Sequence, residues 1–263
     1  MIEFLEDIHR YREILWDLVQ REIKVRYVGS YLGFAWAFIH PAVTVLLLYF
    51  VFTLGIKSQP VQDVPFALWL VAGMIPWNFY SEAISSSVYS VLDKSFLVKK
   101  IRFRVSILPL IKILASCFVH SVFILLMFFI FWISGQSISF HSLQVFYYFA
   151  ACTFVILGFS YITSSVVVFF RDFGHLVSMA LQFGFWFTPI FWPYKAVPEN
   201  YRLLLNINPA YYIIEGYRDS FLHKVWFWNK PYDTLIFWVI SLIVFVSGVK
   251  LFRTLKPHFA DVI

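Results

Sequence analysis

The stretch "REIKVRYVGSYLGFAWAFIHP", residues 21–41, decides the class of fold, because charge stops abruptly within it. Arg21, Lys24 and Arg26 end a charged segment, and from Tyr27 to Ile56 there is no Asp, Glu, Lys or Arg. A helix that crosses a membrane needs about 20 consecutive, mostly apolar residues. The pattern therefore predicts a chain that passes from a charged surface helix directly into a bilayer.

The composition of the whole chain indicates the same class. Of its 263 residues, 60% are hydrophobic, 22% are aromatic and only 14% are charged, whereas soluble domains carry roughly a quarter charged residues. The net charge of +6 comes from cations that lie beside apolar runs, as the positive-inside rule expects, and this placement argues against nucleic acid as a partner. We expect an all-α integral membrane protein that is surrounded by membrane lipid.

Apolar stretches predict six membrane spans, at about 34–55, 65–90, 105–133, 144–170, 176–192 and 234–252. Lys and Arg number five in residues 1–33, five in 93–104, one in 171–175 and three in 250–263. The connections on the opposite side hold one in 56–64 and none in 134–143, although the long segment 193–232 holds five. Because short loops set the orientation, we predict a multi-pass protein of the cytoplasmic (inner) membrane with both termini in the cytoplasm.

Two segments outside the spans also have helical patterns. Residues 4–24 alternate apolar and charged side chains at helical spacing, which predicts an amphipathic helix on the membrane surface. Residues 193–232 predict two short helices broken at Asn208-Pro209, with Asn as the cap and Pro at the first helical position. Both are too short to span, so they enter the outer leaflet and return, or lie on it. Glu215 and Arg218, three residues apart on one helical face, can pair, and the plain interpretation is an ordinary surface salt bridge.

The chain lacks the motifs of common catalytic chemistry. No Gly is followed by Lys, so there is no P-loop, and any ATP hydrolysis belongs to another chain. No His or Cys cluster has zinc spacing, so we predict neither a metal site nor a catalytic residue. The ionisable residues within spans, which are functional candidates by default, are His40, Glu82, Lys112 and His120. They are too scattered for a strong proton relay: Lys112 can extend to the cytoplasmic surface, and a lone His such as His120 is more often a packing residue.

The abundance of aromatic side chains is the feature of the sequence that points to a function. The 32 Phe, 15 Tyr and 10 Trp gather in "IPWNFY" (75–80), "FYYF" (146–149) and "FGFWFTPIFWPY" (183–194). Belts at the membrane interface and side chains facing lipid account for most of them. "WNFY", however, falls in the middle of a span, where flat rings with a polar tip suit a passage for sugars. A pore lined in part by aromatic rings is therefore a second interpretation.

Four segments carry a resemblance to a known family: "VRYVGSYLGFAWAFIHP" (25–41), "GMIPWNFY" (73–80), "VFFRDFGHLVSMALQFGFWFTPIFW" (168–192) and "NPAYYIIEGYRDS" (208–220). In this order and spacing they resemble the ABC-exporter permeases for cell-surface polysaccharides, which include those for O-antigen, capsule and teichoic acid. The resemblance implies a six-span half-transporter that works as a homodimer with two separate nucleotide-binding ATPase subunits. ATP and magnesium would then bind only to the ATPases, and the substrate would be a polymer linked to undecaprenyl diphosphate.

The resemblance also implies roles for particular residues. The N-terminal amphipathic helix and residues 93–104 would touch the ATPases, and the link at Arg171 and Asp172 would make a second contact. The expected contact residues are Arg21, Lys24, Arg26, Asp93, Lys94, Phe96, Lys99, Lys100, Arg171 and Asp172. The short helices would form an outer gate, with Asn208, Pro209, Glu215 and Arg218. The candidate channel-lining residues are Trp77, Tyr80, Phe183, Trp186 and Phe187.

We therefore expect one permease domain over residues 1–263. Its parts are a cytoplasmic amphipathic helix (1–33), spans one to five (34–192), outer-face gate helices (193–232), span six (233–252) and a cytoplasmic tail (253–263). Gly29 and Gly33 would let the chain turn upright after the surface helix, and Pro41 would let the first span bend, so that these three residues form a hinge.

Other functions remain open at this point. An ion-coupled secondary transporter would use Glu82, and a related permease could move small drugs or lipids. A membrane enzyme that makes the polymer is the weakest of these, because the metal or acid–base groups that it needs are missing.

Overall fold

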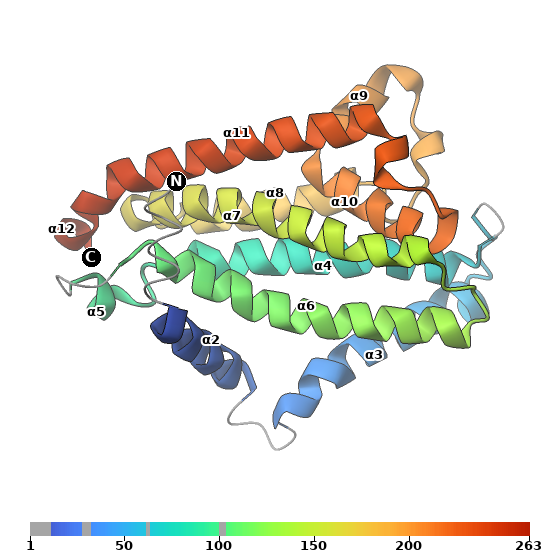
Figure 1. Ribbon diagram of the computed structural model, residues 1–263, viewed down its shortest axis with the longest axis horizontal. Coiled ribbons are helices and arrows are strands. Elements are labelled where there is room, and N and C mark those ends of the chain that lie inside the picture. Colours follow the sequence, from blue (N-terminus) through green and yellow to red (C-terminus); the bar gives the residue numbers. More distant parts are fainter. Residues whose placement is uncertain (1–11, 28–32, 62–63, 100–103) are drawn as a thin grey trace.

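The computed structural model describes residues 12–27, 33–61, 64–99 and 104–263, and the described residues form helices and their connections with no β-strand (Figure 1). The predicted all-α fold is confirmed for this part of the chain. The helices are α2 (Arg12–Tyr27), α3 (Trp36–Tyr49), α4 (Phe66–Val88), α5 (Ser95–Val98), α6 (Ile107–Ile133), α7 (Val145–Phe169), α8 (Phe173–Phe187), α9 (Glu199–Ile207), α10 (Pro209–Arg218), α11 (Pro231–Leu255) and α12 (Phe259–Val262). A π-helical segment, η2 (Phe50–Gly55), extends α3.

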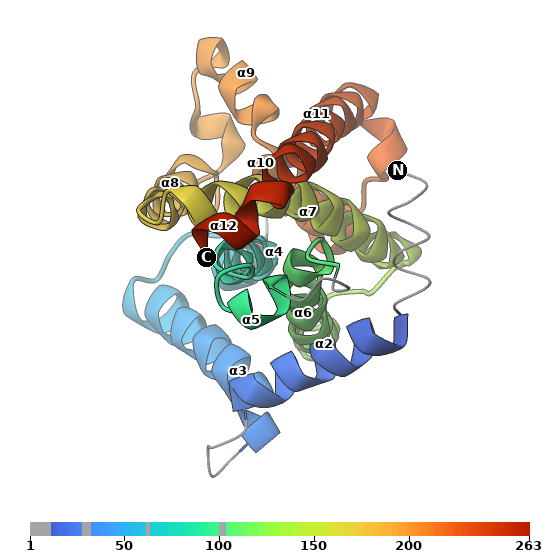
Figure 2. The same cartoon turned by 90° about the vertical axis from the view of Figure 1, so that its left-hand side faces the viewer.

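Helix α4 is the centre of the bundle. It contacts α3, α6, α7, α8 and α10, and in the end-on view of Figure 2 it lies inside the ring of other helices. Most of its residues are buried, so its neighbours are protein side chains more than lipid. This position explains why a helix in the middle of the bundle can carry Pro76 and Asn78. Glu82, in contrast, lies on an exposed part of the same helix.

Three helical stretches are long and apolar enough to cross a membrane: Ile107–Ile133, Phe140–Phe169 and Pro231–Val262. They coincide with the spans predicted at 105–133, 144–170 and 234–252. The other predicted spans fall on helices of different character: α4 is long but less apolar, the apolar stretch Ala42–Gly55 is shorter, and α8 has 15 residues. At 1.5 Å per residue α8 reaches about 22 Å, less than the about 30 Å of a hydrocarbon core.

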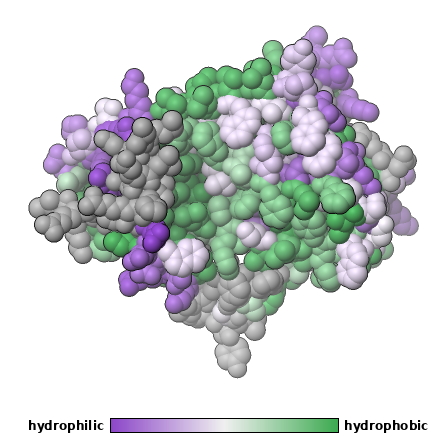
Figure 3. Space-filling view, in the orientation of Figure 1, coloured by the Kyte–Doolittle hydropathy of each residue, from purple (hydrophilic) through white to green (hydrophobic). Residues whose placement is uncertain are grey.

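The surface of the bundle is apolar in its middle and polar at its ends. Figure 3 shows a broad green band of hydrophobic residues between purple, hydrophilic residues at the two ends of the long axis. One end carries α2, α5 and α12, and the other carries α9 and α10 (Figure 1). This distribution is the one that a bilayer around the middle of the bundle requires.

Two glycines bring α7 and α11 together. A Cβ atom on Gly158 would lie 2.8 Å from the backbone nitrogen of Phe245, and one on Gly248 would meet the carbonyl oxygen of Gly158. The two backbones therefore pack directly on each other, which is the usual role of small residues between membrane helices.

Replacing this contact tests the packing. Gly158→Val should force α7 and α11 apart, because the added side chain meets backbone atoms that cannot move aside, at a cost of about 1–3 kcal/mol. The measurement is the amount of monodisperse protein that remains in detergent after heating. Gly55→Ala is the control, since a Cβ atom there lies 3.7 Å from its nearest neighbour. Equal thermal survival of Gly158→Val and wild type would contradict the model of packing.

Candidate functional site

At the end of the bundle that carries α12, helix α2 packs on α6. Leu15, Val19 and Glu22 are buried, and their spacing of four and three residues places them on one stripe of α2. A helix thus runs from Arg12 to Tyr27 and overlaps the one predicted over residues 4–24. Its position on a membrane surface stays a prediction, and the residues before Arg12 lie outside the described part of the chain.

An ion-pair network fixes α2 at this position. Lys112 Nζ lies 2.7 Å from Glu22 Oε1 and 3.3 Å from Asp93 Oδ2, and Lys94 Nζ lies 4.0 Å from Glu22 Oε2. The side chains of Lys112 and Glu22 are only 13% and 10% exposed, so water screens their attraction weakly. Lys112 is thus paired instead of extending to the surface, and the network joins α2, α6 and the segment before α5.

Glu22 was not among the predicted site residues. Its position three residues after Val19 on the apolar stripe of α2 was the available signal, because a carboxylate on a buried face needs a partner.

The other predicted ATPase-contact residues lie around this network. Figure 2 shows α2, α5 and α12 together at the end that faces the viewer. Arg21, Lys24, Phe96, Lys99, Arg171 and Asp172 are exposed, whereas Asp93 and Lys94 belong to the network. Lys99 Nζ also donates to the carbonyl oxygen of Ile263, 3.3 Å away. Lys100 and the side chain of Arg26 lie outside the described part, and the contact role of the whole set stays a prediction.

The predicted hinge is described only at one of its three positions. Gly33 has a φ of +48°, a backbone conformation that favours glycine. Gly29 and the side chain of Pro41 lie outside the described residues.

A double-mutant cycle measures the Glu22–Lys112 pair. Glu22→Gln and Lys112→Met should each destabilise the solubilised protein, and the pair should show a coupling of about 0.5–3 kcal/mol because the side chains are in direct contact. Thermal unfolding in detergent reads out both. The matched control is the exposed pair of Arg202 and Glu199, 3.2 Å apart, for which about 0.3–0.5 kcal/mol is expected. Equal coupling in the two cycles would show that the network does not anchor α2.

At the opposite end, the break between α9 and α10 has the predicted cap. Asn208 Oδ1 accepts a hydrogen bond from the backbone nitrogen of Ala210 at 3.1 Å, and Pro209 is the first residue of α10. The second polar atom of the cap, Asn208 Nδ2, donates to Thr188 Oγ1 at 2.8 Å. The cap therefore also attaches α10 to the segment that follows α8.

Arg218, at the end of α10, is completely buried. It donates to the carbonyl oxygens of Pro189 (2.7 Å) and Ile190 (3.0 Å) and to Glu215 Oε1 (2.6 Å). Its guanidinium carbon lies 3.5 Å from the centroid of the Trp69 ring on α4. The Glu215–Arg218 pair is thus present, and its interpretation as an ordinary surface salt bridge is wrong for Arg218.

The surroundings of Arg218 explain how the charge is tolerated. Burial lowers its pKa, and the neighbouring Glu215 carboxylate opposes that effect. Gly73 supplies the space, since a Cβ atom there would lie 2.7 Å from Arg218 Nη2. Trp69 was not predicted as a partner, because nothing in the local sequence relates it to a residue 149 positions away.

Substitution of Arg218 should destabilise this end of the bundle more than any loss of a surface charge. Arg218→Met leaves Glu215 and two carbonyls without their donor, at a cost of about 3–5 kcal/mol. Arg218→Lys keeps the positive charge but loses the planar guanidinium group that donates to several acceptors at once. The melting temperature of this variant should therefore fall between those of wild type and Arg218→Met. Arg202→Met, at the exposed pair, is the control. If Arg218→Lys had the same melting temperature as wild type, the planar guanidinium group would not be required at this position.

The five candidate channel residues divide into two groups. Phe183, Trp186 and Phe187 on α8 are 74%, 64% and 51% exposed, whereas Trp77 and Tyr80 on α4 are 5% and 8% exposed. Trp77 packs behind α8, with its ring 5.8 Å from that of Phe185. In the single chain only the α8 residues are available to line a passage.

The exposed face of α8 is also partly polar. His175, Ser178 and Gln182 are exposed beside the aromatic residues. Such side chains are costly against hydrocarbon, so this face is suited to a polar passage or to another protein surface.

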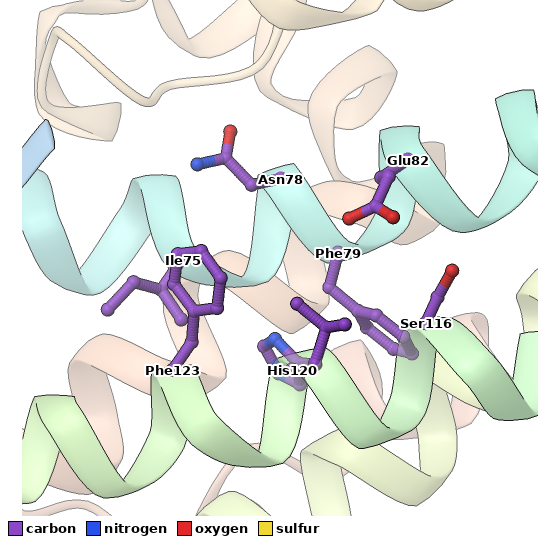
Figure 4. Close-up of a pocket in the computed structure, with 8 residues that line it drawn as sticks. Ile75, Asn78, Phe79, Glu82, Ser116, His120 and Phe123 are labelled. Carbon is purple, nitrogen blue, oxygen red and sulfur yellow. The ribbon is translucent and has the colours of Figure 1, made fainter. Parts of the chain in front are cut away.

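A small pocket lies between α4 and α6, and its lining includes Asn78, Phe79, Glu82, Ser116 and His120 (Figure 4). The water-accessible volume of about 20 Å³ holds about one water molecule, so a sugar does not fit. His120 Nε2 is 2.7 Å from the Tyr217 hydroxyl, and its ring stacks on Phe79. It is the hydrogen-bonded packing residue that was expected. Among the described residues, no group of three or more His, Cys, Asp or Glu could hold a metal ion.

The sequence of this chain is similar to those of known transport proteins. The chain is 27% identical to the O-antigen export system permease protein RfbA of Myxococcus xanthus over 99% of each chain, and 26% identical to the Klebsiella pneumoniae protein of that name over 95% of each. It is 23% identical to the polysialic acid transport protein KpsM of Escherichia coli over 90% of this chain and 91% of that protein. The model of the ABC-2 type transporters matches residues 14–222. The chain therefore belongs to the ABC-2 type transporter family.

Proposed function

We propose that this chain is the transmembrane subunit of an ATP-driven exporter that moves lipid-linked cell-surface polysaccharide across the cytoplasmic membrane. The observation that carries the proposal is the exposed aromatic and polar face of α8, on a chain whose relatives over nearly the full length are named O-antigen export permeases. The polymer class is O-antigen, capsule or teichoic acid, and the names of the relatives favour the first two.

The proposal includes a homodimer, which the exposed face of α8 supports. In a homodimer this face would border a channel between the copies, with Phe183, Trp186 and Phe187 along its wall. Trp77 and Tyr80 would support the wall from behind. Aromatic rings offer flat contacts to successive sugar units without strong hydrogen bonds to any of them, so that a polymer joined to undecaprenyl diphosphate could move lengthwise.

Six passages through the membrane are part of this proposal. They are α3 with η2, α4, α6, α7, α8 and α11, while α9 and α10 form an outer gate. An even number of passages leaves both termini on one side, and the cations of residues 1–33 and 93–104 make that side the cytoplasm. α2 then lies along the cytoplasmic membrane surface.

Coupling to ATP hydrolysis would use the end where α2 is anchored. Two ATPase subunits would bind the exposed residues of α2, the α5 region and the turn at Arg171 and Asp172, and ATP with magnesium would bind only to those subunits. The Glu22–Lys112 pair would pass a displacement of α2 to α6, with Gly33 as the described part of the hinge toward α3.

Polysaccharide export and assembly with the ATPase can both be tested in cells that carry one variant of the chain. A double Phe183→Ala, Trp186→Ala variant should lower surface polysaccharide at least about tenfold, because each turn of α8 loses a wall contact worth about 1 kcal/mol. A P-loop ATPase should still co-purify with it in mild detergent. Trp132→Ala is the matched control, since Trp132 on α6 is 68% exposed and would face lipid.

The rival functions predict different outcomes. An ion-coupled transporter would purify without an ATPase and would lose activity in Glu82→Gln. A permease for small drugs or lipids would leave surface polysaccharide unchanged when the chain is deleted. Either result would overturn the proposal.

A further inference from the structure

One face of α4 is polar in the half of the helix that leads to Asp93 and the ion pairs of α2. From residue 78 to residue 89, every residue that is not buried has a polar side chain: Asn78, Ser81, Glu82, Ser85, Ser86 and Tyr89. Their spacing of three and four residues places them on one side of the helix. These six residues are the polar stripe of α4.

The polar stripe begins at the middle of the bundle. Phe79, the residue after Asn78, stacks on His120 with the ring centroids 4.3 Å apart, and His120 is the central residue of the 27 in α6. At a rise of 1.5 Å per residue, Glu82 and Ser85 lie only about 6 and about 10 Å from Asn78 along α4. Half of a hydrocarbon core is about 15 Å thick, so with α6 centred in a bilayer the stripe lies at hydrocarbon depth.

Helix α8 has polar side chains at the same depth. It runs beside α4 in the opposite direction, because Gly184 lies against the ring of Trp77 and Gly174 lies against the hydroxyl of Tyr89. The exposed polar residues of α8 between these two contacts are His175, Ser178 and Gln182. The two neighbouring helices therefore both carry accessible polar groups over this half of the bundle.

Several of these polar groups have no partner within the protein. No residue in the described part of the chain donates to or accepts from the side chains of Asn78, Ser85 or Gln182. An amide or hydroxyl group without a hydrogen bond is costly in hydrocarbon, and the carboxylate of Glu82 is costly as well. Lipid is therefore an unfavourable neighbour for the polar stripe.

Water fits the polar stripe better than a second protein surface does. Charged residues are depleted in the centre of protein interfaces, and Glu82 is exposed within the stripe. Asn78 and Glu82, one turn apart on α4, also line the pocket between α4 and α6 that holds about one water molecule (Figure 4). The stripe continues to Tyr89, and Asp93 is exposed beyond it at the polar end of the bundle, so water has a continuous polar path to Asn78.

From these observations we infer that the polar stripe of α4 is the wall of a water-filled cleft, which admits water from the end of the bundle at α2 as far as Asn78. What passes along the cleft rests on the proposed function. The cleft would be the hydrated half of the export passage, in which the sugar units of the polymer keep their water before they reach the aromatic rings of α8.

Water access can be measured by the reaction of introduced cysteines with a charged methanethiosulfonate reagent, because the thiolate that reacts forms in water. The assay uses the permease–ATPase complex in fragmented membranes, so that the reagent reaches both sides, from cells that make no polymer. Cys117 and Cys152 are first replaced by Ala. Ser81→Cys and Ser85→Cys should then react at least about tenfold faster than cysteines that face lipid.

The controls give the reaction rates for the two other possible neighbours. Leu125→Cys on α6 and Val246→Cys on α11, at positions 67% and 55% exposed, report on lipid, and Ala83→Cys, at a position 0% exposed, reports on packed protein. A rate at either stripe variant that matches the lipid controls or Ala83→Cys would overturn the inference. Co-purification of the ATPase with each variant shows that the complex is assembled.

A second variant tests whether the polymer passes along the cleft. Ser85→Trp should cause the loss of most surface polysaccharide, because the indole ring fills the cleft, whereas Val246→Trp should leave the amount unchanged. Normal export by Ser85→Trp would contradict this part of the inference.

The two assays also separate failure of the cleft from failure of the proposed function. Fast labelling, together with surface polysaccharide that persists in cells lacking the chain, would contradict polysaccharide export and keep the water-filled cleft. Slow labelling, together with export that requires the chain, would remove the cleft and leave the proposed function in place.

Discussion

Burying a guanidinium group costs several kcal/mol unless carbonyl, carboxylate and aromatic partners surround it. Arg218 satisfies this constraint only when three separate segments meet: α10, the Pro189–Ile190 backbone and Trp69 on α4. This end of the bundle therefore cannot rearrange in small steps, because a displacement of any one segment leaves a buried charge without its partners. This single group ties the short helices α9 and α10 to the central helix of the bundle.

The other end of the bundle is held by a network that is less deeply buried. Glu22, Lys112 and Asp93 join α2 to α6 through side chains that retain some contact with water. Such a contact can transmit a displacement and still yield at a moderate cost. α4 and α6, which pack on each other, connect the two ends, so the bundle combines a firmly fixed end at α10 with a more adaptable end at α2.

Local patterns in the sequence predicted what depends on neighbouring residues. The all-helical fold, the apolar character of α6, α7 and α11 and the Asn208-Pro209 cap all follow from composition or spacing within a few residues. Contacts between distant segments could not be predicted this way, and Glu22–Lys112 and Trp69–Arg218 are examples. Hydropathy also does not tell a neighbour made of lipid from one made of protein, so the burial of Trp77 and Tyr80 within the chain could not be predicted from the sequence.

The shortness of α8 has a consequence for the surrounding membrane. The helix ends at Phe187, and the backbone that continues at Pro189 and Ile190 has its carbonyl oxygens satisfied by Arg218. Non-helical backbone at membrane depth is tolerated only where protein supplies such donors. In the proposed arrangement α8 crosses the membrane, and its length of about 22 Å would fall short of a hydrocarbon core of about 30 Å and would thin the adjacent bilayer. In the proposed orientation, a lipid-linked head group beside α8 would meet a shorter apolar barrier than elsewhere in the same membrane.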